Sequence, residues 1–228
     1  MNGTLYGVSV GPGDPELMTL KAVRILSNCP VIAAPRTGGS AMLALEIATG
    51  ALNFADKTVL PLDFTMSPDA NVRAENHRAL FAALRTHLDA GADVAVLNLG
   101  DASIYGTWSY LETLAREADY KTVTIPGVPS FCAAAAALGE SLTEISTPLH
   151  ILPGAWCDPD EILALSGTKV ILKSARALSA LKAALHERGY SSKTALVENC
   201  GLPGERIFPT LDEAEGNEGY FSIFLIRP

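Results

Sequence analysis

The stretch Gly-Val-Ser-Val-Gly-Pro-Gly-Asp-Pro-Glu, from Gly7 to Glu16, decides the fold of this chain. It places a glycine-rich turn directly after an apolar strand and before a helix, which is where open α/β sheets bind small molecules. Gly11 and Gly13 let the backbone bend and come close to a ligand, and Pro12 stiffens the bend. Asp14 stands at the position of a helix N-cap.

The turn does not match the motifs that bind nucleotide phosphates. With Pro15 as the first helical residue, the Asp14 carboxylate takes the free N–H groups and the positive dipole end that a pyrophosphate needs. The dinucleotide fingerprint requires a third glycine where Glu16 stands, and the Gly-Lys-Ser/Thr of a P-loop does not follow. A nicotinamide-dependent dehydrogenase is therefore a weak alternative, which measurable NADH binding would revive.

Length, composition and charge bound the class of protein. The chain has 228 residues, of which 48% are hydrophobic, enough for one α/β domain or two small ones. The net charge of −8 argues against nucleic-acid binding, which relies on Lys and Arg. No apolar run reaches the roughly 18 residues that span a bilayer, and the N-terminus carries no export signal. We expect a cytoplasmic protein that binds neither nucleic acid nor a membrane.

The cysteines form no recognisable framework. Cys29, Cys132, Cys157 and Cys200 are widely scattered, and none belongs to a Cys-x-x-Cys pair. Disulfides and a zinc site are therefore not expected, and the thiols are interpreted as structural. No set of protein side chains has the spacing of a metal site, so no metal ligands are predicted.

Strands and helices alternate along the first part of the chain. Apolar strand segments are predicted at residues 5–10, 30–34, 58–62, 93–99 and 122–125. They are apolar almost throughout, as expected when helices cover both faces of a mostly parallel sheet. Helical patterns separate them, and an alanine-rich helix is predicted from Ser130 to Leu138.

A polar segment at residues 139–148 is interpreted as a linker to a second series of strands. These strands are predicted at residues 149–152, 169–172, 194–197, 206–209 and 220–226. The prediction is two α/β domains, residues 1–140 and 141–228, the first with a mostly parallel sheet and the second with a mixed sheet. The cleft between the domains is the expected ligand site.

Two further turns follow predicted strands of the first domain. Gly100 permits close backbone approach, and Asp101 places a carboxylate at the carboxyl end of a strand. That carboxylate either binds an ammonium, a ribose hydroxyl or a cationic sulfur compound, or caps the next helix. After the turn at Pro126 and Gly127, Ser130 is either a helix N-cap or a ligand contact, and the two roles are compatible.

Together these segments resemble the tetrapyrrole methyltransferases of cobalamin and sirohaem biosynthesis. The family's Gly-x-Gly-Pro-Gly-Asp corresponds to residues 9–14, its Gly-Asp-Pro-x-x-Tyr to residues 100–105, and its Pro-Gly-x-x-Ser/Ala to residues 126–130. The resemblance extends through the whole chain. Ala102 stands where the family usually has proline, which suggests a looser turn after Asp101.

Other segments resemble one branch of that family. Residues 126–136, 170–173, 198–201 and 220–222 look like the branch that methylates carbon 20 of precorrin-2 or cobalt-factor II. Cys200 departs from related members, which have glycine there. The alternatives are a methyltransferase acting on another ring position and a non-catalytic tetrapyrrole-binding protein. A carrier would bind the macrocycle but not S-adenosylmethionine, so equilibrium binding distinguishes a carrier from a methyltransferase.

The resemblance also implies the ligands and the residues that contact them. The methyl donor is S-adenosylmethionine, which leaves as S-adenosylhomocysteine, and the protein is a homodimer. Donor contacts are expected at Pro12, Leu99, Gly100, Asp101, Ile104, Pro129, Ser130, Leu172, Lys173 and Cys200. Candidate bases for the proton that leaves the tetrapyrrole substrate are Asp101, Tyr105 and Glu198. Arg36, Lys173 and Arg176 are either anchors for the carboxylates of the tetrapyrrole or ordinary solvated surface charges.

Overall fold

The computed structural model divides the chain into two compact units, Met1–Pro129 and Ser130–Pro228. It describes residues 1–36, 41–174, 177–214 and 219–228. The sequence analysis places the boundary after residue 140. The division falls earlier because helix α5 (Ser130–Leu138) packs against strand β10 (Ser222–Ile226) of the second unit.

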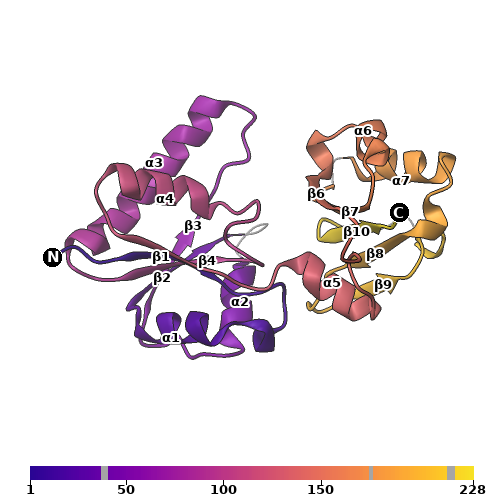
Figure 1. Ribbon diagram of the computed structural model, residues 1–228. Coiled ribbons are helices and arrows are strands. Elements are labelled where there is room, and N and C mark those ends of the chain that lie inside the picture. The colour runs from indigo at the N-terminus through magenta and orange to yellow at the C-terminus, as the bar shows by residue number, and fades with distance from the viewer. Residues whose placement is uncertain (37–40, 175–176, 215–218) are drawn as a thin grey trace. The chain divides into compact units, whose positions relative to one another are not determined.

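The first unit is a parallel sheet with helices on both faces. Its strands are β1 (Leu5–Ser9), β2 (Val31–Pro35), β3 (Thr58–Leu62), β4 (Val94–Asn98) and β5 (Thr122–Ile125). They lie in the order β3-β2-β4-β1-β5, and every neighbouring pair is parallel. The helices are α1 (Leu20–Asn28), α2 (Leu43–Thr49), α3 (Ala70–Asp89) and α4 (Trp108–Glu117). Helices α3 and α4 cover one face and α1 and α2 the other (Figure 1).

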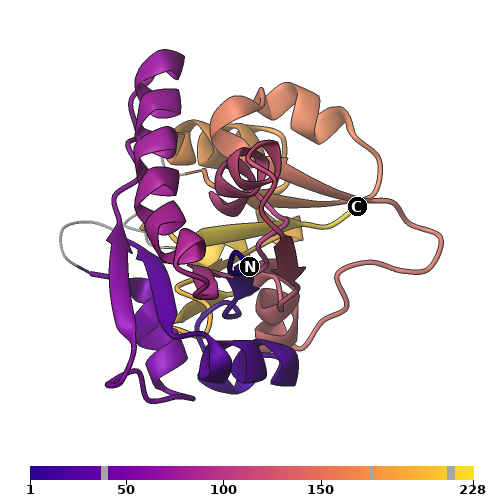
Figure 2. The same ribbon diagram turned by 90° about the vertical axis from the view of Figure 1, so that its left-hand side faces the viewer.

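Burial explains the sequence pattern of this sheet. All five residues of β4 are buried, because the strand lies in the middle of the sheet and has helices on both sides. The view from the side places the long helix α3 and the helix α1 on opposite sides of the strands (Figure 2). The predicted α/β class with a mostly parallel first sheet is confirmed.

The first helix begins later than the sequence analysis expects. The Asp14 carboxylate accepts a hydrogen bond from the Glu16 N–H and caps only a short 3-10 helix, η1 (Pro15–Leu17). Met18 and Thr19 are extended, so the 3-10 helix does not continue into α1. The hydroxyl of Thr19 caps α1. Asp14 is thus an N-cap followed by Pro15 as the first helical residue, as predicted, but the helix that it caps is η1 and not α1.

The second unit contains a mixed sheet, as predicted. Its strands are β6 (Leu149–Pro153), β7 (Thr168–Leu172), β8 (Thr194–Glu198), β9 (Arg206–Phe208) and β10. In the order β6-β7-β10-β8-β9, only β6 and β7 are parallel neighbours. Besides α5, the helices are α6 (Pro159–Ala164), α7 (Leu178–Glu187) and the 3-10 helices η2 (Gly154–Trp156), η3 (Ser191–Lys193) and η4 (Leu211–Glu213).

The core of the second unit lies between its sheet and the helices α6 and α7. Ile171, Leu196 and Phe224 of the sheet pack with Leu181 and Leu185 of α7, and all five side chains are buried. Burying each such side chain contributes about 1.5–3 kcal/mol relative to exposure. Over the described ranges of the chain, every helix is too short or too polar to cross a bilayer.

Candidate active site

The turns that follow β1 and β4 are joined through their backbones. These strands are parallel neighbours, so both turns lie at the carboxyl edge of the first sheet. The Gly100 N–H donates to the Gly11 carbonyl oxygen at 2.7 Å. The φ angles of Gly11 and Gly100 are 77° and 69°, in the left-handed region that favours glycine. The first two glycine motifs therefore form one piece of structure.

Packing against the protein's own chain explains two of these glycines. A Cβ atom at Gly11 would stand 3.3 Å from the carbonyl oxygen of Leu17. At Gly127 it would stand 2.4 Å from the Cβ of Ser9 and 2.7 Å from the carbonyl oxygen of Gly100. The sequence analysis expects Gly11 to make room for a ligand. At Gly127 the neighbouring turns take the side-chain space, whereas at Gly11 a Cβ would make a tight contact and the left-handed φ already favours glycine.

Asp101 ties the turn after β4 to the turn after β5. One carboxylate oxygen accepts hydrogen bonds from the N–H and the hydroxyl of Ser103, at 2.8 and 2.5 Å, and the other accepts the Gly127 N–H at 2.8 Å. Burial raises the pKa of this carboxyl, but the hydrogen bonds from Ser103 and Gly127 outweigh burial and leave the pKa below its ordinary value. Asp101 does not cap the next helix, because α4 begins at Trp108.

Ser9 is a residue of this edge that the sequence analysis missed. Its buried hydroxyl donates to the Ile125 carbonyl at 2.7 Å and accepts the Ala102 N–H at 2.9 Å. It thereby connects the same two segments that Asp101 connects. The available signal was a serine inside an otherwise apolar strand, since a buried hydroxyl needs hydrogen-bond partners.

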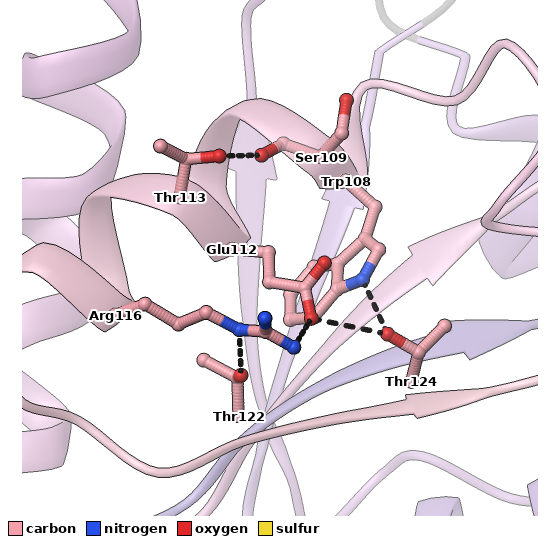
Figure 3. A network of polar contacts seen from close by, with 7 residues as sticks. All are labelled: Trp108, Ser109, Glu112, Thr113, Arg116, Thr122 and Thr124. Atoms are coloured by element: carbon pink, nitrogen blue, oxygen red, sulfur yellow. Dashed lines mark hydrogen bonds and ion pairs between the residues drawn. The ribbon is translucent and has the colours of Figure 1, made fainter.

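Helix α4, which follows the Asp101 loop, is braced against β5 by a polar network (Figure 3). The Trp108 indole N–H donates to the Thr124 hydroxyl at 2.8 Å, and the Trp108 ring lies over Gly7, where a Cβ would come within 2.3 Å of it. The other members of the network are Glu112, Arg116 and Thr122. The far end of the Asp101 loop is therefore fixed to the sheet.

The remaining predicted residues of the first unit differ in exposure. Pro12 is buried, whereas Leu99, Ile104 and Pro129 are half-buried. Tyr105 is 41% exposed and has a left-handed backbone with φ of 50°. Non-glycine residues rarely adopt this conformation, and such strain is concentrated at functional sites.

Arg36 follows β2, at the same carboxyl edge of the first sheet. Its guanidinium forms an ion pair with Asp63 at 3.1 Å, and both side chains are exposed. A pair of this kind stabilises the fold by at most about 1 kcal/mol, so a ligand carboxylate can replace Asp63 at small cost.

In the second unit, β7 and β8 are each followed by a residue whose backbone is left-handed. Lys173 directly follows Leu172, the last residue of β7, and has φ of 53°; Asn199 directly follows β8 and has φ of 51°. Lys173 is exposed, yet partial desolvation of its ammonium lowers its pKa. Ser130 is the first residue of α5, not the capping residue before it. Arg176 lies outside the described residues.

Glu198, at the end of β8, already has partners for both carboxylate oxygens. One contacts the Arg206 guanidinium at 2.6 Å, and the other accepts the Gly219 N–H at 2.5 Å. Cys200 is buried, and burial together with Glu205 raises the pKa of its thiol to about 11. In the parts of the chain that the structure describes, no three His, Cys, Asp or Glu side chains converge as metal ligands.

The carboxyl edge around Asp101 carries negative charge. Residues 98–106 contain one ionised carboxylate and no Lys, Arg or His. A buried carboxylate attracts a cationic group and repels a phosphate. The residues present therefore fit a positively charged small molecule, and they do not fit a nucleotide phosphate.

Comparison with known proteins agrees with this class of site. Residues 4–215 match the family model of the tetrapyrrole (corrin/porphyrin) methylases. The chain is 31% identical over 242 residues to the cobalamin biosynthesis protein CobIJ of Mycobacterium tuberculosis, covering 98% of this chain and 46% of that protein. It thus spans about half the length of the first curated relatives it matches.

Two further matches run nearly end to end. The cobalt-precorrin-2 C(20)-methyltransferase of Salmonella typhimurium is 31% identical over 233 residues, covering 100% of this chain and 97% of that protein. The uroporphyrin-III C-methyltransferase of Thermus thermophilus, solved in complex with S-adenosyl homocysteine, has a TM-score of 0.73 at 24% identity, covering 99% of this chain and 97% of that one. The fold and the matches define the class as an α/β protein of two compact units. This chain belongs to the tetrapyrrole (corrin/porphyrin) methylase family.

Proposed function

We propose that this protein transfers a methyl group from S-adenosylmethionine to carbon 20 of precorrin-2 or cobalt-factor II. The proposal rests on the match over the full length of both chains with a protein named as a cobalt-precorrin-2 C(20)-methyltransferase. The charge of Asp101 supports the proposal, because an ionised carboxylate attracts a sulfonium cation. Residues of the alternative classes, such as the third glycine of a dinucleotide site, are absent from the sequence.

The donor, when bound, supplies a methyl carbon on a positively charged sulfur, which is already a good electrophile. The protein's task is to align the substrate carbon with that methyl group, and positioning of this kind lowers a barrier by about 7–11 kcal/mol. We assign donor contacts in the first unit to Pro12, Leu99, Gly100, Asp101, Ile104 and Pro129. Donor contacts in the second unit follow from the family resemblance alone, at Ser130, Leu172, Lys173 and Cys200.

The proton that leaves carbon 20 needs only a weak acceptor, because it leaves a cationic intermediate. The oxygens of Asp101 already accept three hydrogen bonds, and those of Glu198 are taken by Arg206 and the Gly219 N–H, so neither carboxylate is free to approach the substrate carbon. Of the three candidates, we rank Tyr105 first, as a relay to solvent: its exposed hydroxyl oxygen takes this proton as its own hydroxyl proton passes to water. We assign Arg36 and Lys173 to the carboxylates of the substrate, and Arg176 stays an untested prediction.

The decisive experiment supplies the purified protein with methyl-labelled S-adenosylmethionine and either precorrin-2 or cobalt-factor II. The expected result is label at carbon 20 of one of them, with S-adenosylhomocysteine as the second product. Label on a later corrin intermediate would instead assign another ring position. Binding of the macrocycle without any affinity for S-adenosylhomocysteine would indicate a carrier and overturn the proposal.

The proposal includes a homodimer. Light scattering at micromolar concentration tests the assembly, and a monomer of 24.0 kDa would contradict it. The expected cytoplasmic location stays a prediction that cell fractionation tests.

A further inference from the structure

The Ser9 hydroxyl is positioned between two turns that both carry residues of the proposed donor site. It donates to the Ile125 carbonyl at the end of β5 and accepts the Ala102 N–H one residue beyond Asp101. Ser9 and Ala102 are 0% and 2% exposed, so water does not compete for these bonds. The Ala102 N–H has its acceptor only because position 9 carries a side-chain oxygen.

This hydrogen bond makes two residue choices mutually exclusive. A proline at position 102 would place its ring carbon Cδ about 1.5 Å from the backbone nitrogen, close to where the hydrogen now points. The Ser9 oxygen lies 2.9 Å from that nitrogen. The ring carbon would therefore come within about 2 Å of the oxygen, far inside the 3.5–4.0 Å of ordinary contact. Proline fits position 102 only when position 9 lacks the hydroxyl.

The sequence departs from the family motifs at both of these positions. The motif Gly-x-Gly-Pro-Gly-Asp begins with glycine where this chain has Ser9, and Gly-Asp-Pro-x-x-Tyr has proline where it has Ala102. The two departures lie 93 residues apart in the chain and are joined by one hydrogen bond. A proline ring would restrict φ of this turn covalently, whereas here the Ser9 hydroxyl restricts it from outside.

We propose that Ser9 and Ala102 are a coupled pair that sets the Asp101 turn, with Ser9 as a positioning residue for the donor site. The hydroxyl takes over the restraint that a proline would supply and fixes the spacing across which Asp101 reaches Gly127. The looser turn expected from Ala102 alone is thus compensated. The part that concerns the donor rests on the proposed function, whereas the coupling itself does not.

The test is a double-mutant cycle on the full chain with Ser9→Ala, Ala102→Pro and the combination of both. Ser9→Ala removes only the oxygen and keeps the Cβ, so backbone freedom is unchanged. A control cycle combines Ala102→Pro with Thr194→Val, which removes a buried strand hydroxyl that donates to the Tyr190 carbonyl in the other compact unit. Urea unfolding, hydrogen exchange of the Ala102 amide and S-adenosylhomocysteine binding are measured for each variant.

The expected result is that Ser9→Ala rescues Ala102→Pro. Ala102→Pro alone lowers the unfolding midpoint and weakens S-adenosylhomocysteine binding by about tenfold or more, and the double variant recovers most of both losses. In Ser9→Ala alone, the Ala102 amide exchanges faster, because it has lost its acceptor. The losses in the Thr194→Val cycle are additive, because the two sites share no partner.

Equal losses for Ala102→Pro with and without the Ser9 hydroxyl would overturn the coupling, and so would a double variant that does not fold. Rescue of stability without rescue of S-adenosylhomocysteine binding would overturn the positioning role. If the wild type binds no S-adenosylhomocysteine while the unfolding cycle still shows rescue, the proposed function fails and the coupling stands. The two proposals therefore fail separately.

Discussion

The carboxyl edge of the first sheet and the strand ends of the second sheet hold their candidate residues in different ways. In the first unit, backbone hydrogen bonds and two buried side chains, Ser9 and Asp101, fasten three turns to one another. In the second unit, the buried carboxylate of Glu198 binds Arg206 of β9 and the Gly219 N–H, whereas Lys173 is an exposed side chain with a left-handed backbone after β7.

The difference teaches what each region can tolerate. At the first edge, Ser9, Asp101 and the Gly11–Gly100 backbone pair each have a partner on another turn, so a change at one turn displaces the others. At the second, the exposed side chain of Lys173 is replaceable at little cost in stability, whereas the buried Glu198 is not. We therefore expect stability and donor binding to fail together in the first unit and to separate in the second.

The largest loss of stability is expected from Glu198→Ala. It leaves the Arg206 charge and the Gly219 N–H without the carboxylate, in a site where the Glu198 side chain is only 7% exposed. The cost is about 2–3 kcal/mol in the free energy of unfolding, because Arg206 is partly solvated. Urea unfolding measures it. The double variant with Arg206→Ala should cost less than the sum of the two single changes, and strict additivity would show that the pair is not coupled.

Gly127→Ala should lower the free energy of unfolding by about 2 kcal/mol, since the new Cβ would collide with Ser9 and with the backbone of Gly100. It should also abolish tight binding of the donor. The control is Gly189→Ala. Gly189 has a left-handed φ of 71° but open space where a Cβ would stand, so the change should lower the free energy of unfolding by about 1 kcal/mol and leave donor binding unchanged. Isothermal calorimetry with S-adenosylhomocysteine checks both. Unchanged affinity in Gly127→Ala would break the comparison between the two regions.

Asp101→Asn should cost about 1–2 kcal/mol at neutral pH, because an amide N–H₂ replaces one oxygen that accepts a hydrogen bond. The pKa of Asp101 is lower in the folded state. Its contribution to stability is therefore fully present above the unfolded pKa, near 3.9, and is lost as the pH falls through the lower folded value.

Unfolding measured from pH 7 to pH 2.5 tests this sign. The gap between the wild type and Asp101→Asn should narrow only below about pH 4. A gap that stays constant down to the lowest pH would show that the charge of Asp101 contributes nothing to the junction of the turns.

The smallest effect on stability is expected from Lys173→Ala, within about 0.5 kcal/mol, because the side chain is exposed. The Michaelis constant for the tetrapyrrole should rise severalfold with little change in kcat, since a uniform binding contact is lost. Steady-state kinetics measure both, with the exposed Lys21→Ala as the matched control. An unaltered Michaelis constant would remove Lys173 from the substrate anchors.

Apolar runs in the sequence predicted the bounds of some strands correctly. The strands at residues 58–62 and 122–125 have the predicted bounds, and the parallel and mixed sheets are confirmed. Asp14 caps the short helix η1, and α1 begins only after Thr19. The sequence did not separate the two helices, because Asp14 and Thr19 are both good caps and local sequence does not say which turn continues. The position of α5 depends on its packing against β10, a contact made across most of the second unit.

The sequence by itself determined the family and the order of the motifs, because both depend on residue types at fixed spacing along the chain. It also determined that Gly100 and Asp101 stand at the end of a strand. Only the tertiary structure decided that Asp101 bonds Gly127 and that Ser9 bonds Ala102. Those partners are 26 and 93 residues apart in the chain, and the order of strands in the sheet alone brings them within hydrogen-bond distance.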